Sequence, residues 1–109
     1  MGISVMDGMK TGTVTLGSAS LYLGYSGIVA PNKRGLLREI TDFTANPKGT
    51  GDGSNLLESV CEQADNNNII LLLKADTPRL QAYYTKYGFI TIQSKSDILM
   101  ARQPTPVKP

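Results

Sequence analysis

Apolar residues recur along this chain with two different spacings, and the order of those spacings predicts its secondary structure. Short alternating or β-branched runs are typical of strands, and they occupy residues 13–16, 20–25, 36–43, 89–94 and 97–102. Residues 69–75 are mostly consecutive apolar residues, which is typical of a strand buried on both faces in a parallel pair. The turn-prone pair Gly17-Ser18 separates the first two runs, so these are predicted to form a hairpin.

Two segments have the spacing of helices. Between residues 54 and 65 the apolar positions recur every three or four residues, as one face of a helix requires, and they are Leu56, Leu57, Val60, Cys61 and Ala64. Ser54 is predicted to be the N-cap of this helix, and the three asparagines at 66–68 are predicted to end it. A second helix is predicted to begin with Pro78 at its first position and to end at Gly88.

The resulting order is three strands, a helix, a strand, a helix and two strands, which predicts an α/β fold built on a mixed sheet. A chain of 109 residues suits one domain rather than two, and this domain is predicted to span residues 1–102. Residues 103–109 contain three prolines and no candidate for the core. They are therefore predicted to form a flexible, proline-rich tail.

The composition removes several kinds of chemistry, because histidine is absent and Cys61 is the only cysteine. Ser/His and Cys/His catalysis, cysteine-based metal cages and an intrachain disulfide are all excluded. Cys61 lies on the apolar stripe of the first predicted helix, where a core thiol is expected rather than a nucleophile.

The charge and hydropathy of the chain limit its partners. The net charge of +2 is not gathered into a basic stripe, so nucleic acid is not an expected partner. The longest uninterrupted apolar run, residues 69–73, is far shorter than the roughly 20 residues that span a bilayer. We therefore expect a cytoplasmic protein that does not enter a membrane.

A glycine-rich loop, Lys-Gly-Thr-Gly-Asp-Gly at residues 48–53, joins a predicted strand to a predicted helix. Backbone N–H groups at such a helix N-terminus favour phosphate binding. Three known ligand loops do not fit: a P-loop needs Lys-Ser or Lys-Thr where Ser54-Asn55 stands, an EF-hand needs Glu where Gln63 stands, and the glycine spacing differs from G-x-G-x-x-G. A loop that serves only as a sharp turn remains an alternative.

The loop resembles the Arg/Gln-x-x-Gly-x-Gly/Ala loop of the GCN5-related N-acetyltransferase (GNAT) family. A second segment, Ala-Tyr-Tyr-Thr-Lys-Tyr-Gly-Phe at residues 82–89, resembles the family's helix that ends in Tyr-x-x-x-Gly-Phe. It follows the loop after one helix and one buried strand, as in the family. The resemblance implies a GNAT-like fold, in which a mixed, mostly antiparallel sheet is flanked by helices and its central strands splay apart.

The resemblance also implies how acetyl-coenzyme A, the co-substrate, is held without a metal. The coenzyme pyrophosphate would meet the loop and the start of the helix, namely Lys48, Gly49, Gly51, Asp52, Gly53 and Ser54. The pantetheine arm would add to the sheet like an extra strand, along the backbone of Phe43 and Ala45.

Two residues are implied to be catalytic. The hydroxyl of Tyr84 would return a proton to the departing thiolate as a general acid. Glu39, on the strand before the loop, would act through water as the general base toward the amine, with Asp42 as the next candidate. The asparagine that the family commonly has at the start of the second helix is absent, and Asp76-Thr77 stands there.

The implied activity is transfer of an acetyl group from acetyl-coenzyme A to a primary amine by direct attack, the amine acceptor being a small molecule or a protein. Only about 35 residues precede the central strand, which is short for the strand and helix pair that form the family's acceptor side. Two other functions therefore stay open: a catalytically reduced module that binds coenzyme A or a protein partner, and a structural protein whose glycine loop is only a turn. A homodimer, in which a neighbouring chain completes the acceptor side, is a further expectation.

Overall fold

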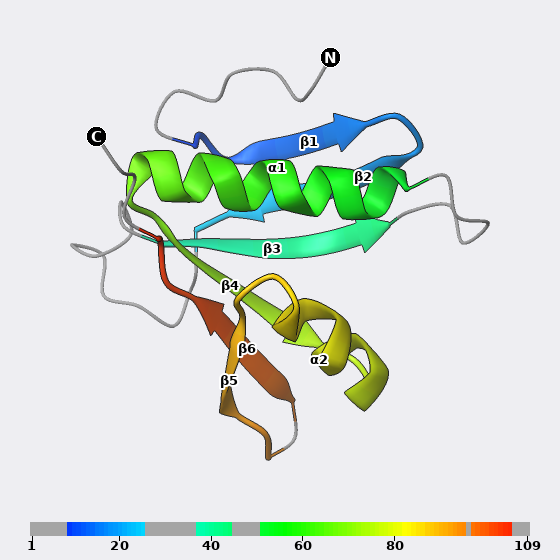
Figure 1. The fold of residues 1–109 in the computed structure, drawn as a ribbon, viewed down its shortest axis with the longest axis vertical. Coiled ribbons are helices and arrows are strands. Elements are labelled where there is room, and N and C mark those ends of the chain that lie inside the picture. The colour runs from blue at the N-terminus through cyan, green and yellow to red at the C-terminus, as the bar shows by residue number, and fades with distance from the viewer. Residues whose placement is uncertain (1–8, 26–36, 45–50, 96, 106–109) are drawn as a thin grey trace.

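The computed structural model describes residues 9–25, 37–44, 51–95 and 97–105. Within these residues six strands form one sheet, and two helices accompany it (Figure 1). The elements in chain order are β1 (Gly12–Leu16), β2 (Ala19–Gly24), β3 (Leu37–Thr44), α1 (Asp52–Asn67), β4 (Ile70–Ala75), α2 (Pro78–Thr85), β5 (Ile90–Gln93) and β6 (Ile98–Arg102).

The sheet has the order β1-β2-β3-β4-β6-β5. The neighbours β3 and β4 are parallel, and every other neighbouring pair in the described sheet is antiparallel. The predicted mixed, mostly antiparallel sheet flanked by helices is therefore confirmed, as is the hairpin of β1 and β2. Because β3, β4 and β5 run in the same direction, right-handed connections put α1 and α2 on one face of the sheet, and α1 lies across the β1–β3 half of it (Figure 1).

The core lies between this helical face and the alternate strand residues that point toward it. In β2 and β4 every second residue contributes to it, because successive strand side chains point to opposite faces. The largest side chains that are buried completely, or nearly so, are Phe89, Met9, Leu21, Leu23, Leu56, Leu57, Leu71, Leu73, Met100 and Val60. The burial of Met9 ties the chain before β1 to this core.

Helix α1 begins earlier than predicted. Its first residue is Asp52, and the N-cap is Gly51 with φ of 83°, so Ser54 lies inside the first turn and is not the cap. Glycine adopts this left-handed conformation without steric strain, which lets the chain turn into the helix before Ser54 is reached. At the other end the asparagine run ends the helix as predicted, because Asn68 takes a left-handed conformation with φ of 57°.

The remaining elements follow the predicted order, although helix α2 ends at Thr85 and not at Gly88. In β4 only Leu71, Leu72 and Leu73 form a continuous buried run, and Lys74 is exposed, so the strand is not buried on both faces throughout. In the predicted tail, the amide of Thr105 donates a hydrogen bond of 2.7 Å to the carboxylate of Asp65. Residues 106–109 of the tail lie outside the described part of the chain.

Candidate active site

The two central strands separate after a short parallel contact. Strand β3 pairs with β4 only from Leu37, opposite Ile70, to Glu39, opposite Leu72. Beyond Glu39, β3 runs on to Thr44 with pairing only to β2. The predicted splaying of the central strands is confirmed, and it leaves one edge of β3 without a strand partner among the described residues.

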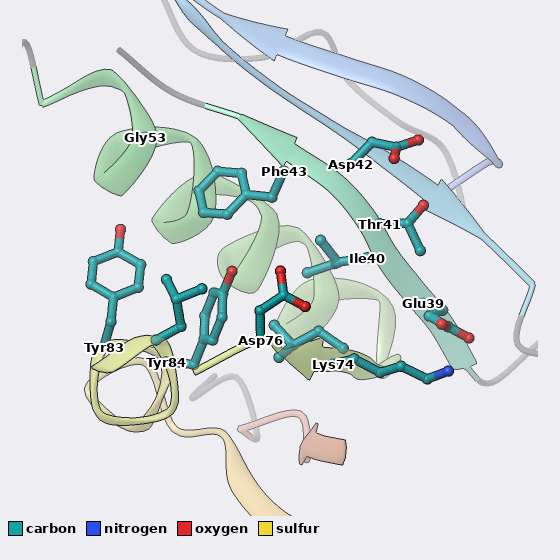
Figure 2. A pocket seen from close by; sticks show the side chains of 12 residues that line it. Glu39, Ile40, Thr41, Asp42, Phe43, Gly53, Lys74, Asp76, Tyr83 and Tyr84 are labelled. Carbon is teal, nitrogen blue, oxygen red and sulfur yellow. The ribbon is translucent and has the colours of Figure 1, made fainter. Parts of the chain in front are cut away.

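A cavity of about 570 Å³ opens where the strands separate (Figure 2). Ligand pockets commonly have volumes of about 300–1,000 Å³, so this one has room for a small molecule. Its walls come from β3, β4 and both helices, and the lining residues are Glu39, Ile40, Thr41, Asp42, Phe43, Gly53, Leu73, Lys74, Asp76, Leu80, Tyr83 and Tyr84.

The N-terminus of α1 reaches this cavity through Gly53. The first helical hydrogen bond runs from the amide of Asn55 to the carbonyl of Gly51, at 3.0 Å. The amides before Asn55 precede the first turn and have no carbonyl partner within the helix. Because the positive end of the helix dipole lies at the same point, this corner of the cavity favours an anion.

The carboxylate of Asp52 is held by the turn between β1 and β2. It accepts hydrogen bonds from the amide of Ser18 at 2.8 Å and from the hydroxyl of Ser18 at 3.0 Å. Gly17, with φ of 59°, allows this approach, since a Cβ there would lie 2.3 Å from a carboxylate oxygen of Asp52. Asp52 therefore fixes the start of α1 against the hairpin. Its negatively charged carboxylate does not suit a phosphate, whereas its backbone amide does.

Ser54 links the two helices. Its hydroxyl lies 3.1 Å from the hydroxyl of Tyr83 on α2, a hydrogen-bond distance in which either oxygen can donate. Burial raises the pKa of Tyr83, and the hydrogen bond with Ser54 opposes that effect without reversing it. The two hydroxyls bridge one corner of the cavity, next to the helix N-terminus.

Tyr84 is the buried phenol of the cavity. Only 6% of the residue is exposed, and its ring contacts those of Phe43, Tyr83 and Phe89 at centroid distances of 6.4, 5.4 and 5.9 Å. Its hydroxyl points into the cavity (Figure 2) and has no hydrogen-bond partner among the described residues. Burial chiefly, then the charges of Tyr83 and Asp76, raise the pKa of Tyr84 to about 12, so the phenol keeps its proton at neutral pH.

Three carboxylates line the cavity. Asp76 follows the last residue of β4, and Figure 2 shows its carboxylate directed toward the same part of the cavity as the hydroxyl of Tyr84. Glu39 lies at the other end of the lining segment of β3, and Asp42, with φ of 53°, lies where the pairing of β2 and β3 shifts register. The lysine of the cavity wall, Lys74, forms an exposed ion pair of 3.8 Å with Asp97.

The sequence-predicted site residues divide into three groups. Those that line the cavity are Glu39, Asp42, Phe43, Gly53 and Tyr84. Those at the start of α1 beside it are Gly51, Asp52 and Ser54. The others, Ala45, Lys48 and Gly49, lie outside the described residues.

Sequence reasoning did not select Asp76 as a site residue. The available signal was its position immediately after a buried parallel strand, since ligands of parallel sheets bind at the carboxyl ends of the strands.

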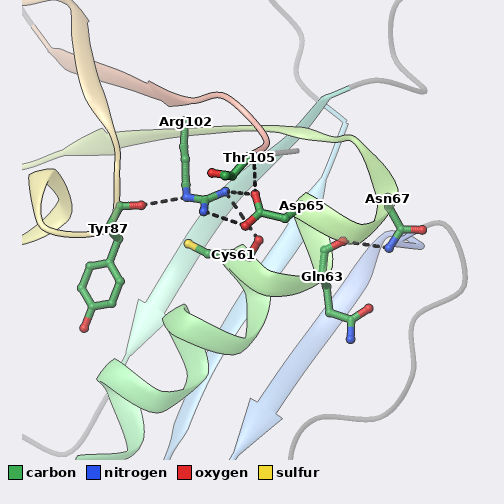
Figure 3. A network of polar contacts seen from close by, with 7 residues as sticks. All are labelled: Cys61, Gln63, Asp65, Asn67, Tyr87, Arg102 and Thr105. Carbon is green, nitrogen blue, oxygen red and sulfur yellow. Dashed lines mark hydrogen bonds and ion pairs between the residues drawn. The ribbon is translucent and has the colours of Figure 1, made fainter. Parts of the chain in front are cut away.

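The C-terminal end of α1 carries a second polar cluster, away from the cavity (Figure 3). The guanidinium of Arg102 binds both carboxylate oxygens of Asp65, at 2.8 and 3.1 Å. Its Nε donates to the carbonyl of Tyr87 at 2.7 Å, and its Nη1 donates to that of Cys61 at 3.5 Å. The network joins α1, β6 and the turn that follows α2.

The charges of this network are matched to each other. Burial alone would raise the pKa of Asp65, but the hydrogen bonds from Arg102 and Thr105 and the charge of Arg102 together leave it lowered. The pKa of Arg102 is raised, chiefly by its hydrogen bond to Asp65. Burial raises the pKa of the Cys61 thiol to about 11, against the opposing charge of Arg102. Cys61 is buried in the hydrophobic core, which confirms the prediction that it is a core thiol.

The described residues contain neither a candidate metal site nor a candidate membrane-spanning helix. The ranges 9–25, 37–44, 51–95 and 97–105 hold no cluster of three His, Cys, Asp or Glu side chains that could bind a metal ion. Neither helix in these ranges has the length and apolar content that crossing a membrane requires.

Comparison with known proteins gives structural neighbours only. No protein-family model matches the sequence, and no curated protein matches it. An acyl-CoA N-acyltransferase from Pseudomonas aeruginosa matches with a TM-score of 0.63 and 23% identity, over 86% of this chain and 70% of that one. A candidate N-acetyltransferase from Lactobacillus plantarum matches with a TM-score of 0.62 and 14% identity, over 85% of this chain and 67% of that one. These likenesses confirm the predicted GNAT-like fold.

Proposed function

We propose that this chain, which has the fold of the acyl-coenzyme A N-acyltransferases, transfers an acetyl group from acetyl-coenzyme A to a primary amine. One observation carries the proposal. A single cavity between the separated strands has a helix N-terminus at one corner and a buried, proton-bearing phenol directed into it. The first group suits the coenzyme's diphosphate, and the second suits its thiol.

The binding side of the cavity supports coenzyme A in two ways. The amides at the start of α1, among them those of Gly53 and Ser54, would bind the diphosphate, because they precede the first helical hydrogen bond. The edge of β3 that faces the gap, including Phe43, offers backbone groups to the amide-containing pantetheine arm. Lys48, Gly49 and Ala45 keep the predicted roles in this binding.

The proposed reaction is a direct transfer. The amine nitrogen forms a bond to the thioester carbon, the carbon–sulfur bond breaks, and the electron pair of that bond leaves on sulfur. Tyr84 gives its proton to the thiolate, and a carboxylate takes the proton that the amine loses, so one amide and one free thiol form. Returning that proton from the carboxylic acid to the phenolate, through the cavity, restores both groups.

Two carboxylates compete for the role of general base. Glu39 is the candidate from the sequence, and Asp76 is the candidate from the geometry, because its carboxylate and the Tyr84 hydroxyl point to the same part of the cavity. The proton donor must reach the sulfur and the proton acceptor must reach the amine nitrogen, and both of these atoms are bonded to the same carbon during the transfer, so donor and acceptor must lie close together. We therefore propose Asp76 as the base, with Glu39 as the alternative.

The test is a transfer assay with the purified chain, acetyl-coenzyme A and a primary amine. We expect release of free thiol together with an amine product that has gained one acetyl group by mass spectrometry. An enzyme-only blank corrects for the thiol of Cys61. Asp76→Asn is expected to lower kcat about 10²-fold or more, and to lower it further than Glu39→Gln does.

Three outcomes would contradict parts of this proposal. Binding of coenzyme A in a thermal-shift assay without any transfer would indicate the reduced binding module instead. The absence of both binding and transfer would indicate that the glycine loop is only a turn. A larger loss of kcat in Glu39→Gln than in Asp76→Asn would return the role of base to Glu39.

A further inference from the structure

Strand β3 contains one residue more than its antiparallel partner β2 can match. Residues 39–41 pair with β2 in one register, and Thr44 pairs with it in a register that is shifted by one residue. Asp42 and Phe43 therefore both face Leu21 of β2, which is the arrangement of a β-bulge. This bulge interrupts the ladder of backbone hydrogen bonds, and both of its residues lie in the wall of the cavity.

The extra residue decides on which side of the sheet Phe43 lies. Successive side chains of a strand point to opposite faces, and Leu21 is buried on the helical face. In an uninterrupted register Asp42 would lie beside Leu21 on that face, and Phe43 would point away from the helices. Figure 2 shows the reverse, because the ring of Phe43 lies on the same side of β3 as Ile40, and the carboxylate of Asp42 lies on the other side. The bulge therefore brings Phe43 into the cavity.

The bulge depends on the backbone conformation of Asp42. Its φ of 53° lies in the left-handed region, which is disfavoured for residues with a Cβ and most of all for β-branched ones. Glycine is typical of the first position of such a bulge, and aspartate and asparagine are the other residues that adopt this conformation most readily. The position thus restricts the residue type for a reason that does not involve charge.

The carboxylate of Asp42 has no comparable role in the described part of the chain. Asp42 is exposed, and its carboxylate forms no hydrogen bond or ion pair within the described residues. It also points away from the phenol of Tyr84 (Figure 2), whereas an acid–base role requires hydrogen-bond reach of the reacting atoms. The geometry therefore favours a role for the backbone of Asp42 and not for its charge.

Phe43 connects β3 to the proton donor of the cavity. Its ring centroid lies 6.4 Å from that of Tyr84 on α2, across the gap where β3 no longer pairs with β4. On the opposite face of the sheet, the hydroxyls of Ser20 and Thr44 lie 3.0 Å apart, at hydrogen-bond distance, which helps to fix the shifted register beyond the bulge. Loss of the bulge would withdraw the ring of Phe43 from Tyr84.

We propose, on the basis of the function proposed above, that Asp42 is a positioning residue whose left-handed backbone turns Phe43 toward Tyr84 and so holds the phenol in place for proton transfer. Asp42→Gly and Asp42→Asn lack the charge but suit the conformation, so kcat should stay close to that of the unsubstituted chain. Asp42→Val opposes the conformation and favours burial beside Leu21 in the uninterrupted register. It should lower kcat about tenfold or more, with a smaller change in KM for acetyl-coenzyme A, because the amides of α1 are not affected.

The matched control is Asn68→Val. Asn68 has nearly the same φ, 57°, at the C-terminal end of α1 and outside the cavity lining, so valine there creates the same backbone conflict away from the site. It should lower the urea midpoint and leave kcat unchanged. If Asp42→Val does not fold, Asp42→Ala replaces it, since alanine opposes the conformation less strongly. An unchanged kcat in the variant used, or a loss of kcat in Asp42→Asn as large as in that variant, would overturn the inference.

Nuclear magnetic resonance separates failure of this inference from failure of the proposed function. Nuclear Overhauser effects between the ring protons of Phe43 and Tyr84 report the contact directly. We expect them in the unsubstituted chain and in Asp42→Gly, and not in Asp42→Val. Their persistence in Asp42→Val would overturn the inference whether or not the chain transfers acetyl groups. Absence of transfer together with the expected pattern would overturn the transferase function and leave Asp42 as the residue that decides where Phe43 lies.

Discussion

The two ends of helix α1 use polar groups in opposite ways. At the C-terminal end, Asp65 and Arg102 satisfy each other at 2.8 and 3.1 Å, and the carbonyl of Tyr87 and the amide of Thr105 complete the network. At the N-terminal end, the amides before Asn55 have no carbonyl partner within the helix, and the cavity lies beside them. One end therefore stabilises the fold, and the other leaves backbone amides beside the cavity, where the proposed function places the diphosphate.

This difference separates residues that are expected to affect folding from residues that are expected to affect turnover. A buried charge with a bidentate partner stabilises only if both members remain, so the cluster at Asp65 is expected to influence folding and not turnover. Polar groups that face a cavity and have no protein partner contribute little to the stability of the free protein. Those at Tyr84 and Asp76 are expected to influence turnover and not folding.

The largest effect is expected at the cavity. Tyr84→Phe keeps the ring and its contacts with Phe43 and Phe89 but removes the proton donor. We expect kcat to fall about 10²-fold or more, with little change in the free energy of unfolding. Tyr22→Phe, on an exposed residue of β2 outside the cavity lining, is the control and should keep full activity. Equal losses in the two variants would contradict the role of Tyr84.

The largest effect on folding is expected at the other end of α1. Asp65→Ala leaves the guanidinium of Arg102, which is 8% exposed, without its carboxylate. We expect a loss of about 3–5 kcal/mol in the free energy of unfolding, measured by urea denaturation. Asp97→Ala breaks the exposed pair with Lys74 and should cost less than about 1 kcal/mol. Similar losses in both variants would show that the buried network contributes no more to the free energy of unfolding than the exposed ion pair does.

The same network predicts a dependence on pH. The pKa of Asp65 is lowered below its ordinary value of 3.8 in the folded protein. Its contribution to stability is therefore complete above that ordinary value and is lost as the pH falls through the folded-state value. Urea denaturation between about pH 5 and pH 3 should show this loss, and Asp65→Asn should not share it. A parallel decline in the two proteins would assign the acid sensitivity to other carboxylates.

A smaller effect is expected where the hairpin holds the start of α1. Asp52→Ala removes the acceptor of both hydrogen bonds from Ser18, which should cost about 1 kcal/mol in the free energy of unfolding. It should also raise KM for acetyl-coenzyme A, because the amides of the first turn lose their fixed position. Asp52→Asn keeps an acceptor oxygen and should affect both quantities less. A change in stability with no change in KM would confine Asp52 to a role in folding.

The smallest effect is expected at the hydroxyl pair of Ser54 and Tyr83, which either binds the ligand or only links the two helices. Ser54→Ala and Tyr83→Phe each remove one hydroxyl of the 3.1 Å pair, and each should change stability by less than about 1 kcal/mol. If the hydroxyl of Ser54 binds the diphosphate, Ser54→Ala alone should raise KM for acetyl-coenzyme A severalfold. The same KM in both variants would leave diphosphate binding to the backbone amides.

The local elements of the fold were predictable because their signals are local. Each of these signals acts on residues close to it in the sequence. They are the alternation in β2, the proline at the start of α2 and the asparagines at the end of α1. The N-cap of α1 was misjudged by three residues, since the N-cap preference of Ser54 competes with the left-handed Gly51 upstream of it. Tyr84 was identifiable through a motif, whereas Asp76 carries no motif.

The sequence by itself determined the order of strands and helices, the glycine-rich entry to α1 and the burial of Cys61 in the apolar stripe. Only the tertiary structure decided that β3 leaves β4 after Glu39, that Asp52 turns toward Ser18, and that Asp76 shares a cavity with Tyr84. The physical reason is the range of the interactions. Helix and strand periodicity depends on neighbouring residues, but a cavity forms where segments far apart in the chain stop pairing, and no short pattern records that point.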